Sequence, residues 1–90
     1  MEFDWADKKD RANQMKHSVS FTLAAEVFLD EHLQEKLDER SVEEERWIAI
    51  GLVDGRELVV AFTLREEVVR LISDRGADRY EREKYWNREI

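Results

Sequence analysis

Three arginines and a tryptophan recur at helical spacing in the last part of the sequence. Arg75, Arg79 and Arg82 are separated by four and three residues, and Trp86 follows four residues later. On a helix these spacings would align the four side chains along one side. Guanidinium groups match phosphate oxygens bidentately, and a tryptophan can stack on a base. The pattern indicates contact with nucleic-acid phosphates, although a solvated helix face paired with neighbouring acids is the simpler interpretation.

A second group of candidate residues surrounds a histidine. Lys16 and His17 stand together, with Lys9 two helical turns earlier, and Arg70 is a further candidate for phosphate contact. A histidine titrates near neutral pH and can act as general acid or base. A cation at the end of a helix is also favoured by the helix dipole without any catalytic role. Neither His17 nor His32 has a second histidine at ligand spacing, so we predict no metal site.

The elements that must position these residues can be predicted from local patterns. Alternation around Phe3 and Trp5 indicates a short edge strand, and Asp7 is the predicted N-cap of a helix over residues 8–16. Ser20 is the predicted cap of a second helix that runs to Leu29. Residues 30–45 remain unassigned, apart from a hint of a strand at 33–37 and an acidic loop at 41–45.

The second half has clearer signals. Strands are expected at residues 47–53, 58–64 and 68–73, joined by turns at Asp54-Gly55 and at residues 65–67. Leu58, Val60, Phe62 and Leu64 are expected on one face of the middle strand. Asp78 followed by Glu81 is a capping-box pattern, which predicts a helix from Arg79 to about Arg88. The capping box explains Glu81 better than a catalytic role does. The expected fold is a single α+β domain: N-terminal helices, an antiparallel β-meander and a C-terminal helix.

Composition narrows the possible functions. The chain has 90 residues, no cysteine and a formal charge of −7. Residues 26–45 hold nine acids against Lys36 and Arg40, so this stretch accounts for the whole excess of negative charge. A basic patch therefore remains possible elsewhere on the surface. No apolar run is long enough to span a membrane, and residues 1–10 are unlike a secretory signal. We therefore expect a cytoplasmic protein without disulfides or a thiolate metal site.

An ordered series of short patterns runs along nearly the whole chain. The patterns are Phe3-x-Trp5, Lys9-x-Arg11-x-Asn13-x-x-Lys16-His17-x-Val19-Ser20-Phe21, Ala24-Ala25-Glu26-Val27-Phe28, Glu45-Arg46-Trp47-x-x-Ile50-Gly51, Leu58-Val59-Val60, Arg70-x-Ile72-Ser73-x-Arg75-x-Ala77, Glu81 and Tyr85. In this order they resemble the BrnT-type toxins. Only residues 30–44 carry little of the resemblance.

The resemblance implies a function as well as a fold. BrnT-type toxins are ribonucleases of type II toxin–antitoxin modules with a fold similar to RelE toxins. Each is neutralised by a BrnA antitoxin with a ribbon-helix-helix DNA-binding domain, and the complex represses its own operon. Metal-independent cleavage of RNA needs groups that accept and donate a proton and cations that stabilise the phosphate. We assign charge stabilisation to Arg75 and Arg79, and proton transfer to His17 or Lys9, provided that the first helix lies beside the last. Further substrate contacts are assigned to Arg70, Arg82, Trp86 and Lys16.

The sequence also departs from the family pattern around Arg75. Gly76 replaces a second basic residue, and Asp74 and Asp78 stand where a small residue and a threonine are usual; Ser18 replaces the glycine that normally follows the histidine. A carboxylate close to Arg75 would pair with it and repel RNA. Two alternatives therefore stay open: a non-enzymatic homologue that binds the antitoxin as a co-repressor, and a stand-alone α+β domain unrelated to toxins.

Overall fold

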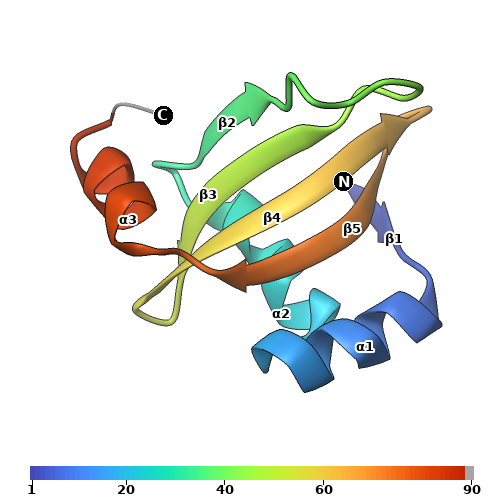
Figure 1. Ribbon diagram of the computed structural model, residues 1–90, viewed down its shortest axis with the longest axis horizontal. Helices are drawn as coiled ribbons and strands as arrows, with labels where there is room; N and C mark the ends of the chain where they lie inside the picture. Colours follow the sequence, from blue (N-terminus) through green and yellow to red (C-terminus); the bar gives the residue numbers. More distant parts are fainter. Residues whose placement is uncertain (89–90) are drawn as a thin grey trace.

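Helices and strands follow one another in blocks along the chain. The computed structural model describes residues 1–88, with a first strand, a group of helices, four further strands and a closing helix (Figure 1). The elements are β1 (Glu2–Asp4), α1 (Asp7–His17), α2 (Phe21–Ala24), the 3₁₀-helix η1 (Ala25–Leu29), β2 (Gln34–Leu37), β3 (Trp47–Val53), β4 (Arg56–Arg65), β5 (Val68–Gly76) and α3 (Arg79–Trp86). The expected α+β class is confirmed.

The five strands of the described chain form one mixed sheet in the order β1-β5-β4-β3-β2. Strands β3, β4 and β5 are the expected antiparallel meander, and β4 and β5 extend beyond their predicted ends. The predicted first strand is indeed an edge strand, but it pairs with β5 in parallel. The hint of a strand at residues 33–37 corresponds to β2, which forms the other edge.

Two tight turns join the strands of the meander, and both use left-handed backbone. Asp54 and Gly55 have φ values of 49° and 79°, as an Asp-Gly hairpin turn requires. The predicted turn between β4 and β5 places Glu66 and Glu67 at φ values of 51° and 76°. Left-handed backbone is unfavourable for residues with a Cβ atom, so this second turn carries local strain.

The helices differ from prediction at two points. Ala6, not Asp7, is the N-cap of α1, and Asp7 lies in the first turn, where its charge suits the helix dipole. The Ser20 hydroxyl caps α2 as predicted, accepting a hydrogen bond of 3.1 Å from the Leu23 amide. The predicted second helix is divided into α2 and η1. Val27 of η1 lies so close to Gly51 of β3 that a Cβ atom there would come within 2.8 Å of the valine Cβ.

Two apolar clusters lie on opposite faces of the sheet. The larger one packs α2 and η1 onto the sheet and comprises the buried residues Val19, Phe21, Ala24, Val27, Ala49, Val53, Leu58, Val60, Phe62, Val69 and Leu71. The smaller one, Ile50, Val59 and Tyr85, lies under α3. Leu64, which was expected to share the buried face of β4, is 56% exposed at the end of the strand. Helix α3 covers only one end of its side of the sheet, and we call this side the open face (Figure 1).

A β-bulge interrupts the pairing of β4 with β5. The neighbouring residues Ala61 and Phe62 of β4 pair with Ser73 and Leu71, so Ile72 is an extra residue without a partner in the register. Side chains alternate between the faces of a regular strand, and an extra residue reverses the alternation beyond it.

The bulge determines where Arg70 and Arg75 point. Five residues apart, they would lie on opposite faces of a regular strand. In the observed register Arg70 pairs with Thr63 and Arg75 with Val59, two residues that are four apart in β4. Both arginines therefore belong to the open face.

Candidate functional site

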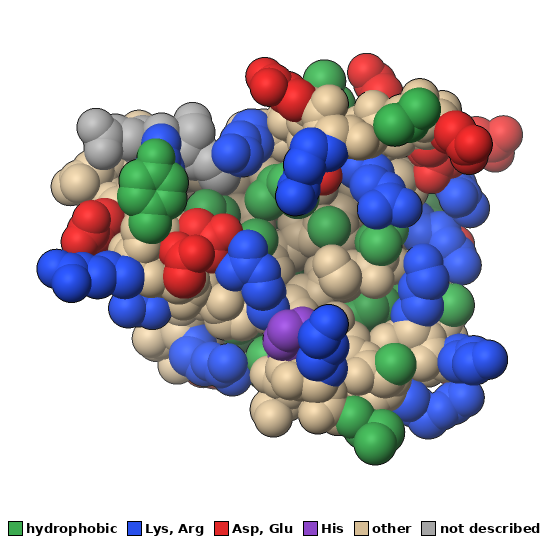
Figure 2. Space-filling model, in the orientation of Figure 1, with side chains coloured by type: hydrophobic (Ala, Val, Ile, Leu, Met, Phe, Trp, Pro, Cys, Tyr) green, Lys and Arg blue, Asp and Glu red, His purple; other side chains and the backbone are tan. Residues whose placement is uncertain are grey.

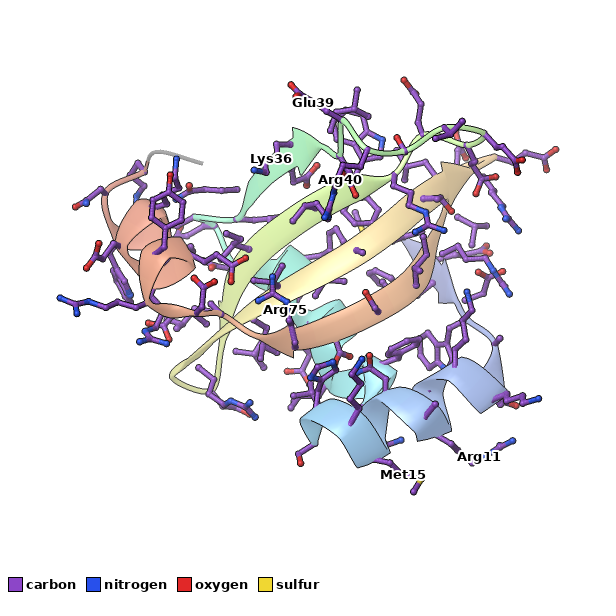
Figure 3. The ribbon with its side chains drawn as sticks, in the orientation of Figure 1. Arg11, Met15, Lys36, Glu39, Arg40 and Arg75 are labelled. Carbon is purple, nitrogen blue, oxygen red and sulfur yellow. The ribbon has the colours of Figure 1, made fainter. Side chains whose placement is uncertain are left out.

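Arg75 occupies the end of the open face that is nearest to α3. Its side chain projects from β5 over the neighbouring strands (Figure 3). Nη1 and Nη2 bind the two carboxylate oxygens of Glu81 at 2.6 and 2.7 Å, and Nη1 also donates to the Gly76 carbonyl at 3.3 Å. These bonds use three of the five N–H donors of the guanidinium. The remaining donors, on Nε and Nη2, have no partner among residues 1–88 and can bind a phosphate oxygen.

Glu81 is held in place by the start of α3. The Asp78 carboxylate accepts a 2.8 Å hydrogen bond from the Glu81 amide, and the Glu81 carboxylate accepts one of 2.9 Å from the Asp78 amide. The predicted capping box is therefore confirmed. The hydrogen bond with Arg75 is the main reason that the pKa of Glu81 is lowered and that of Arg75 is raised. Sequence reasoning identified the cap and considered Glu81 as a partner of the arginine series, but only on a solvated helix face and not for an arginine that belongs to β5.

Tyr85, one turn after Glu81, fixes α3 on the sheet. Its side chain is 1% exposed, and its hydroxyl donates to the Asp30 carboxylate, which also accepts the Leu52 amide at 2.8 Å. Burial raises the pKa of Tyr85 to about 12. Burial would raise the pKa of Asp30 as well, but the hydrogen bonds it accepts outweigh burial and lower it. The anchor holds α3 on the sheet beside β3, and Glu81 reaches Arg75 of β5 from there.

The acidic neighbours of Arg75 do not pair with it, contrary to expectation. Asp74 points away from the open face and is 1% exposed. Its carboxylate and carbonyl both accept hydrogen bonds from the Asn13 side chain of α1, which in turn accepts the Asp74 amide at 3.2 Å. Burial raises the pKa of Asp74 to about 7. Asp78 is used as the cap of α3, so the carboxylate that pairs with Arg75 is Glu81.

The other end of the open face contains a hollow of about 740 Å³. We call it the basic hollow, because its charged lining consists of five bases, Lys9, Arg40, Arg46, Arg65 and Arg70, and three acids, Asp38, Glu43 and Glu44. Figure 2 shows Lys and Arg side chains gathered along this end of the molecule. The lining therefore carries a formal charge of +2 (five bases minus three acids) in a chain whose net charge is −7.

Three of the five bases of the hollow form ion pairs within the described chain, and the one between Arg65 and Glu44 is bidentate. Arg40 binds Asp38 at 3.2 Å and Arg65 binds Glu44 at 3.1 Å. Arg70 binds Asp4 of β1 at 3.2 Å. Lys9 and Arg46 form no ion pair with any residue of the described chain. Arg65 and Glu44 are 56% and 47% exposed, so a phosphate can compete for Arg65, whereas Asp38 is 13% exposed and holds Arg40 from a more buried position.

The remaining candidates of the arginine series lie elsewhere. Arg79, Arg82 and Trp86 line a separate hollow of about 370 Å³ on the outer side of α3. Arg79 binds Glu83 at 3.3 Å, Arg82 donates to the Ala77 carbonyl, and Trp86 donates to Glu57 at 2.8 Å. The expected alignment with Arg75 along one helix side is wrong, because Arg75 belongs to β5 and points to the open face.

Lys16 and His17 form the last turn of α1. The turn ends at Ser18, whose φ of 61° is left-handed, and the Lys16 cation suits the negative end of the helix dipole. The first helix does not pack beside the last as expected: α1 packs against β5 and α3 against β3. Asn13 binds Asp74 at the C-terminal end of β5, and His17 follows Asn13 by one turn on the same side of α1.

Three basic residues of the hollow were missed by sequence reasoning. Arg40 belongs to residues 30–45, a stretch that was left unassigned, and Arg46, which directly follows it, was named only as part of the family pattern. Arg65 precedes the turn into β5. The three arginines could be seen in the sequence, but nothing in it shows that they lie around one hollow. That depends on how residues 38–46 fold over the sheet. Within residues 1–88, no group of three or more His, Cys, Asp or Glu side chains is placed to hold a metal ion, and no helix is long and apolar enough to span a membrane.

Comparison with known families gives a match that covers most of the chain. A family model described as the ribonuclease toxin BrnT of type II toxin–antitoxin systems matches residues 5–81. This range contains Arg75, Glu81 and all five bases of the hollow. The comparison with curated proteins gave no significant match. Because the matched residues make up most of the chain, it belongs to the BrnT family of ribonuclease toxins, which implies an RNA target and an antitoxin partner.

Proposed function

We propose that the chain cleaves RNA at a phosphate bound over the C-terminal end of β5, with Arg75 as the residue that stabilises charge. The 2′-hydroxyl oxygen attacks the adjacent phosphorus and the bond to the 5′-oxygen breaks, which leaves a 2′,3′-cyclic phosphate and a 5′-hydroxyl. Negative charge grows on the phosphate oxygens during this step. A guanidinium fixed in advance stabilises such charge without reorganisation. The bidentate contact with Glu81 at 2.6 and 2.7 Å supports this role, because it fixes Arg75 and leaves two donors unused.

Two protons must also move: one leaves the 2′-hydroxyl and one reaches the 5′-oxygen. We assign one of these transfers to His17, because the contact of Asn13 with Asp74 brings this side of α1 to the end of β5 that carries Arg75. Lys9 lies in the basic hollow and is assigned to substrate binding. The positive charge comes from the chain's own side chains, so the proposed reaction needs no metal ion.

The proposed setting is a complex with an antitoxin. We infer a RelE-like toxin domain that acts in the cytoplasm and is neutralised by a ribbon-helix-helix antitoxin. The acidic stretch of residues 26–45, with nine acids and two bases, suits a basic partner surface. Operator DNA would be bound through the antitoxin, since the net charge of −7 opposes direct binding.

A second candidate function is a non-enzymatic co-repressor that only binds the antitoxin. The same Arg75–Glu81 pair favours it, because a phosphate oxygen must share the guanidinium with a carboxylate that is 20% exposed. In that case neither Arg75 nor His17 would matter for any activity on RNA.

Cleavage of a single-stranded RNA by the purified chain separates the two functions. The variants are Arg75→Ala, Arg75→Lys and, as a matched control, Arg11→Ala, which removes an arginine that points away from the sheet (Figure 3). We expect a loss of roughly 10²- to 10³-fold for Arg75→Ala and little change for Arg11→Ala. Each reaction is repeated with a metal chelator, which should have no effect. Equal rates for wild type and Arg75→Ala, with both proteins folded by circular dichroism, would favour the co-repressor.

A further inference from the structure

The basic hollow lies too far from Arg75 to act on the same phosphate. Arg70 lines the hollow and is five residues before Arg75 on the same face of β5. Their partners in β4, Thr63 and Val59, are four residues apart, and a strand rises about 3.3 Å per residue, so the two positions are roughly 13 Å apart along the sheet. A ligand that touches both must extend along the open face.

Residues 38–46 make the far side of the hollow. The Asp38 amide donates to the Arg46 carbonyl at 2.7 Å, which closes this segment into a loop. Arg40 extends from it over the open face, the side on which Arg75 also lies (Figure 3). The loop therefore brings arginines over the sheet, although its overall composition is acidic.

The hollow has the size and charge for a nucleic-acid backbone. A volume of about 740 Å³ falls in the range of small-ligand sites, which suits a few nucleotides of a single strand and not a duplex. Proteins that bind single strands use a positively charged groove that follows the phosphates. Lys9 and Arg46 have no ion-pair partner within the described residues, so they can bind phosphate without breaking an existing pair.

We propose that the basic hollow is a second phosphate-binding subsite, which holds the RNA strand several nucleotides away from the bond that is cleaved. The substrate is then an extended single strand, and a dinucleotide fills only the Arg75 end. This inference rests on the proposed function, to which it adds the length of the substrate and the role of residues 38–46.

The test measures binding separately from cleavage. The probe is a fluorescent ten-nucleotide RNA methylated at every 2′-oxygen, which lacks the attacking hydroxyl, and binding is followed by anisotropy. Arg46→Ala is compared with Arg11→Ala, and Lys9→Ala with Lys36→Ala. Arg11 and Lys36 do not line the hollow, so each control removes the same charge from another surface.

We expect Arg46→Ala and Lys9→Ala to weaken binding of the probe by roughly fivefold to tenfold, and the controls by less than twofold. The dependence of log K on log salt should become shallower by about 0.7 for each phosphate of the single strand that the variant no longer neutralises. Cleavage of a dinucleotide should be unaffected by Arg46→Ala. Equal weakening by Arg46→Ala and Arg11→Ala would overturn the subsite, because net charge alone would then explain binding.

Failure of the subsite is distinguishable from failure of the proposed function. RNA cleavage that depends on Arg75 but is insensitive to Arg46→Ala, on both long and short substrates, would overturn the subsite alone. Probe binding that depends on Arg46 in a chain without cleavage activity would support the subsite and overturn the ribonuclease.

Discussion

The two ends of the open face are built in different ways. At the Arg75 end, β5 is held from both sides: Asn13 binds Asp74 from the helix side, and Glu81 binds Arg75 from the α3 side. At the other end, Arg70 meets only the exposed Asp4, at 3.2 Å. The first end offers one guanidinium held by short hydrogen bonds of 2.6 and 2.7 Å, whereas the second offers several bases whose ion pairs are longer, at 3.1 to 3.2 Å.

This difference corresponds to two tasks in the recognition of a nucleic acid. Stabilising a transition state requires a donor in a fixed position, because a donor that must reorganise loses much of its effect. Binding a backbone requires positive charge along a path, and the loss of one charge is tolerated. The predictions below test whether the Arg75 end is rigid and whether the hollow tolerates changes in its charges and in the adjoining backbone.

Loss of Asn13 should produce the largest effect. Its side chain makes four hydrogen bonds, to the Val19 carbonyl and to three atoms of Asp74. Asn13→Leu leaves these buried groups without partners, so we expect the free energy of unfolding to fall by about 3 kcal/mol or more. Urea denaturation measures it. Gln14→Ala is the control, because this exposed side chain bonds only to Asp10, and it should cost less than about 0.5 kcal/mol. A similar cost for both variants would show that β5 is not held by Asn13.

Stability should decrease between pH 5 and pH 8 because of Asp74. Burial raises the pKa of its carboxyl from 3.8 to about 7, so the folded chain keeps a proton that the unfolded chain releases near pH 4. Stability that is present at low pH is therefore lost as the pH rises through about 7, by roughly 2–3 kcal/mol over this range. At the hollow the pH dependence of stability has the opposite sign. The hydrogen bond from Arg65 lowers the pKa of Glu44, so the stability that this pair contributes is present at neutral pH and is lost only when the pH falls through the lowered pKa.

Asp74→Asn provides the control for this pH dependence. The amide resembles the protonated acid and cannot ionise, so urea denaturation should give a nearly flat free energy of unfolding from pH 5 to pH 8. Asp10 and Arg56, which also influence the Asp74 carboxyl, are unchanged in the variant. A slope as steep as that of wild type would assign the pH dependence to another group.

Local patterns were sufficient to predict most of the elements. The Asp54-Gly55 turn, the Ser20 cap and the capping box of α3 depend on a few adjacent residues, and all three are present. The second helix is divided into α2 and η1, and η1 packs against Gly51, which is distant in sequence. Such contacts have no local signal.

The site was less predictable than the fold, for the same reason. Arg75 was selected from the sequence, but the helical alignment assumed for it was wrong. Pairing of the arginines with neighbouring acids, Glu81 among them, was expected on a solvated helix face, whereas Glu81 binds Arg75 from α3 across to β5. The bulge at Ile72, which brings Arg70 to the open face, is a matter of pairing register and not of composition.

Breaking one ion pair at each end compares them directly. Glu81→Gln keeps an oxygen for the capping box but removes the charge that binds Arg75, whereas Asp4→Asn removes the charge that binds Arg70. Because Arg75 is 43% exposed, solvent screens part of the pair, and we expect Glu81→Gln to lower the free energy of unfolding by about 1–2 kcal/mol. Asp4→Asn should cost less than about 0.5 kcal/mol. Thermal unfolding at equal ionic strength measures the loss of stability in both variants. Equal losses would show that the two ion pairs are held equally firmly, contrary to the proposed difference between the two ends.

The smallest expected effect is a gain in stability beside the hollow. Glu67 has a φ of 76° in the turn that leads into β5, a conformation that glycine adopts without steric cost. Glu67→Gly should raise the free energy of unfolding by about 0.5–1 kcal/mol, since relief of the left-handed strain outweighs the added freedom of the unfolded chain. Glu57→Gly, inside β4 where the backbone is extended, should instead be destabilising. Because Glu67 does not line the basic hollow, binding of the methylated RNA probe should stay within twofold of wild type. A gain in stability with unchanged binding would show that the hollow tolerates changes in the adjoining backbone, whereas a loss of binding would mean that the strained turn helps to position Arg65 and Arg70.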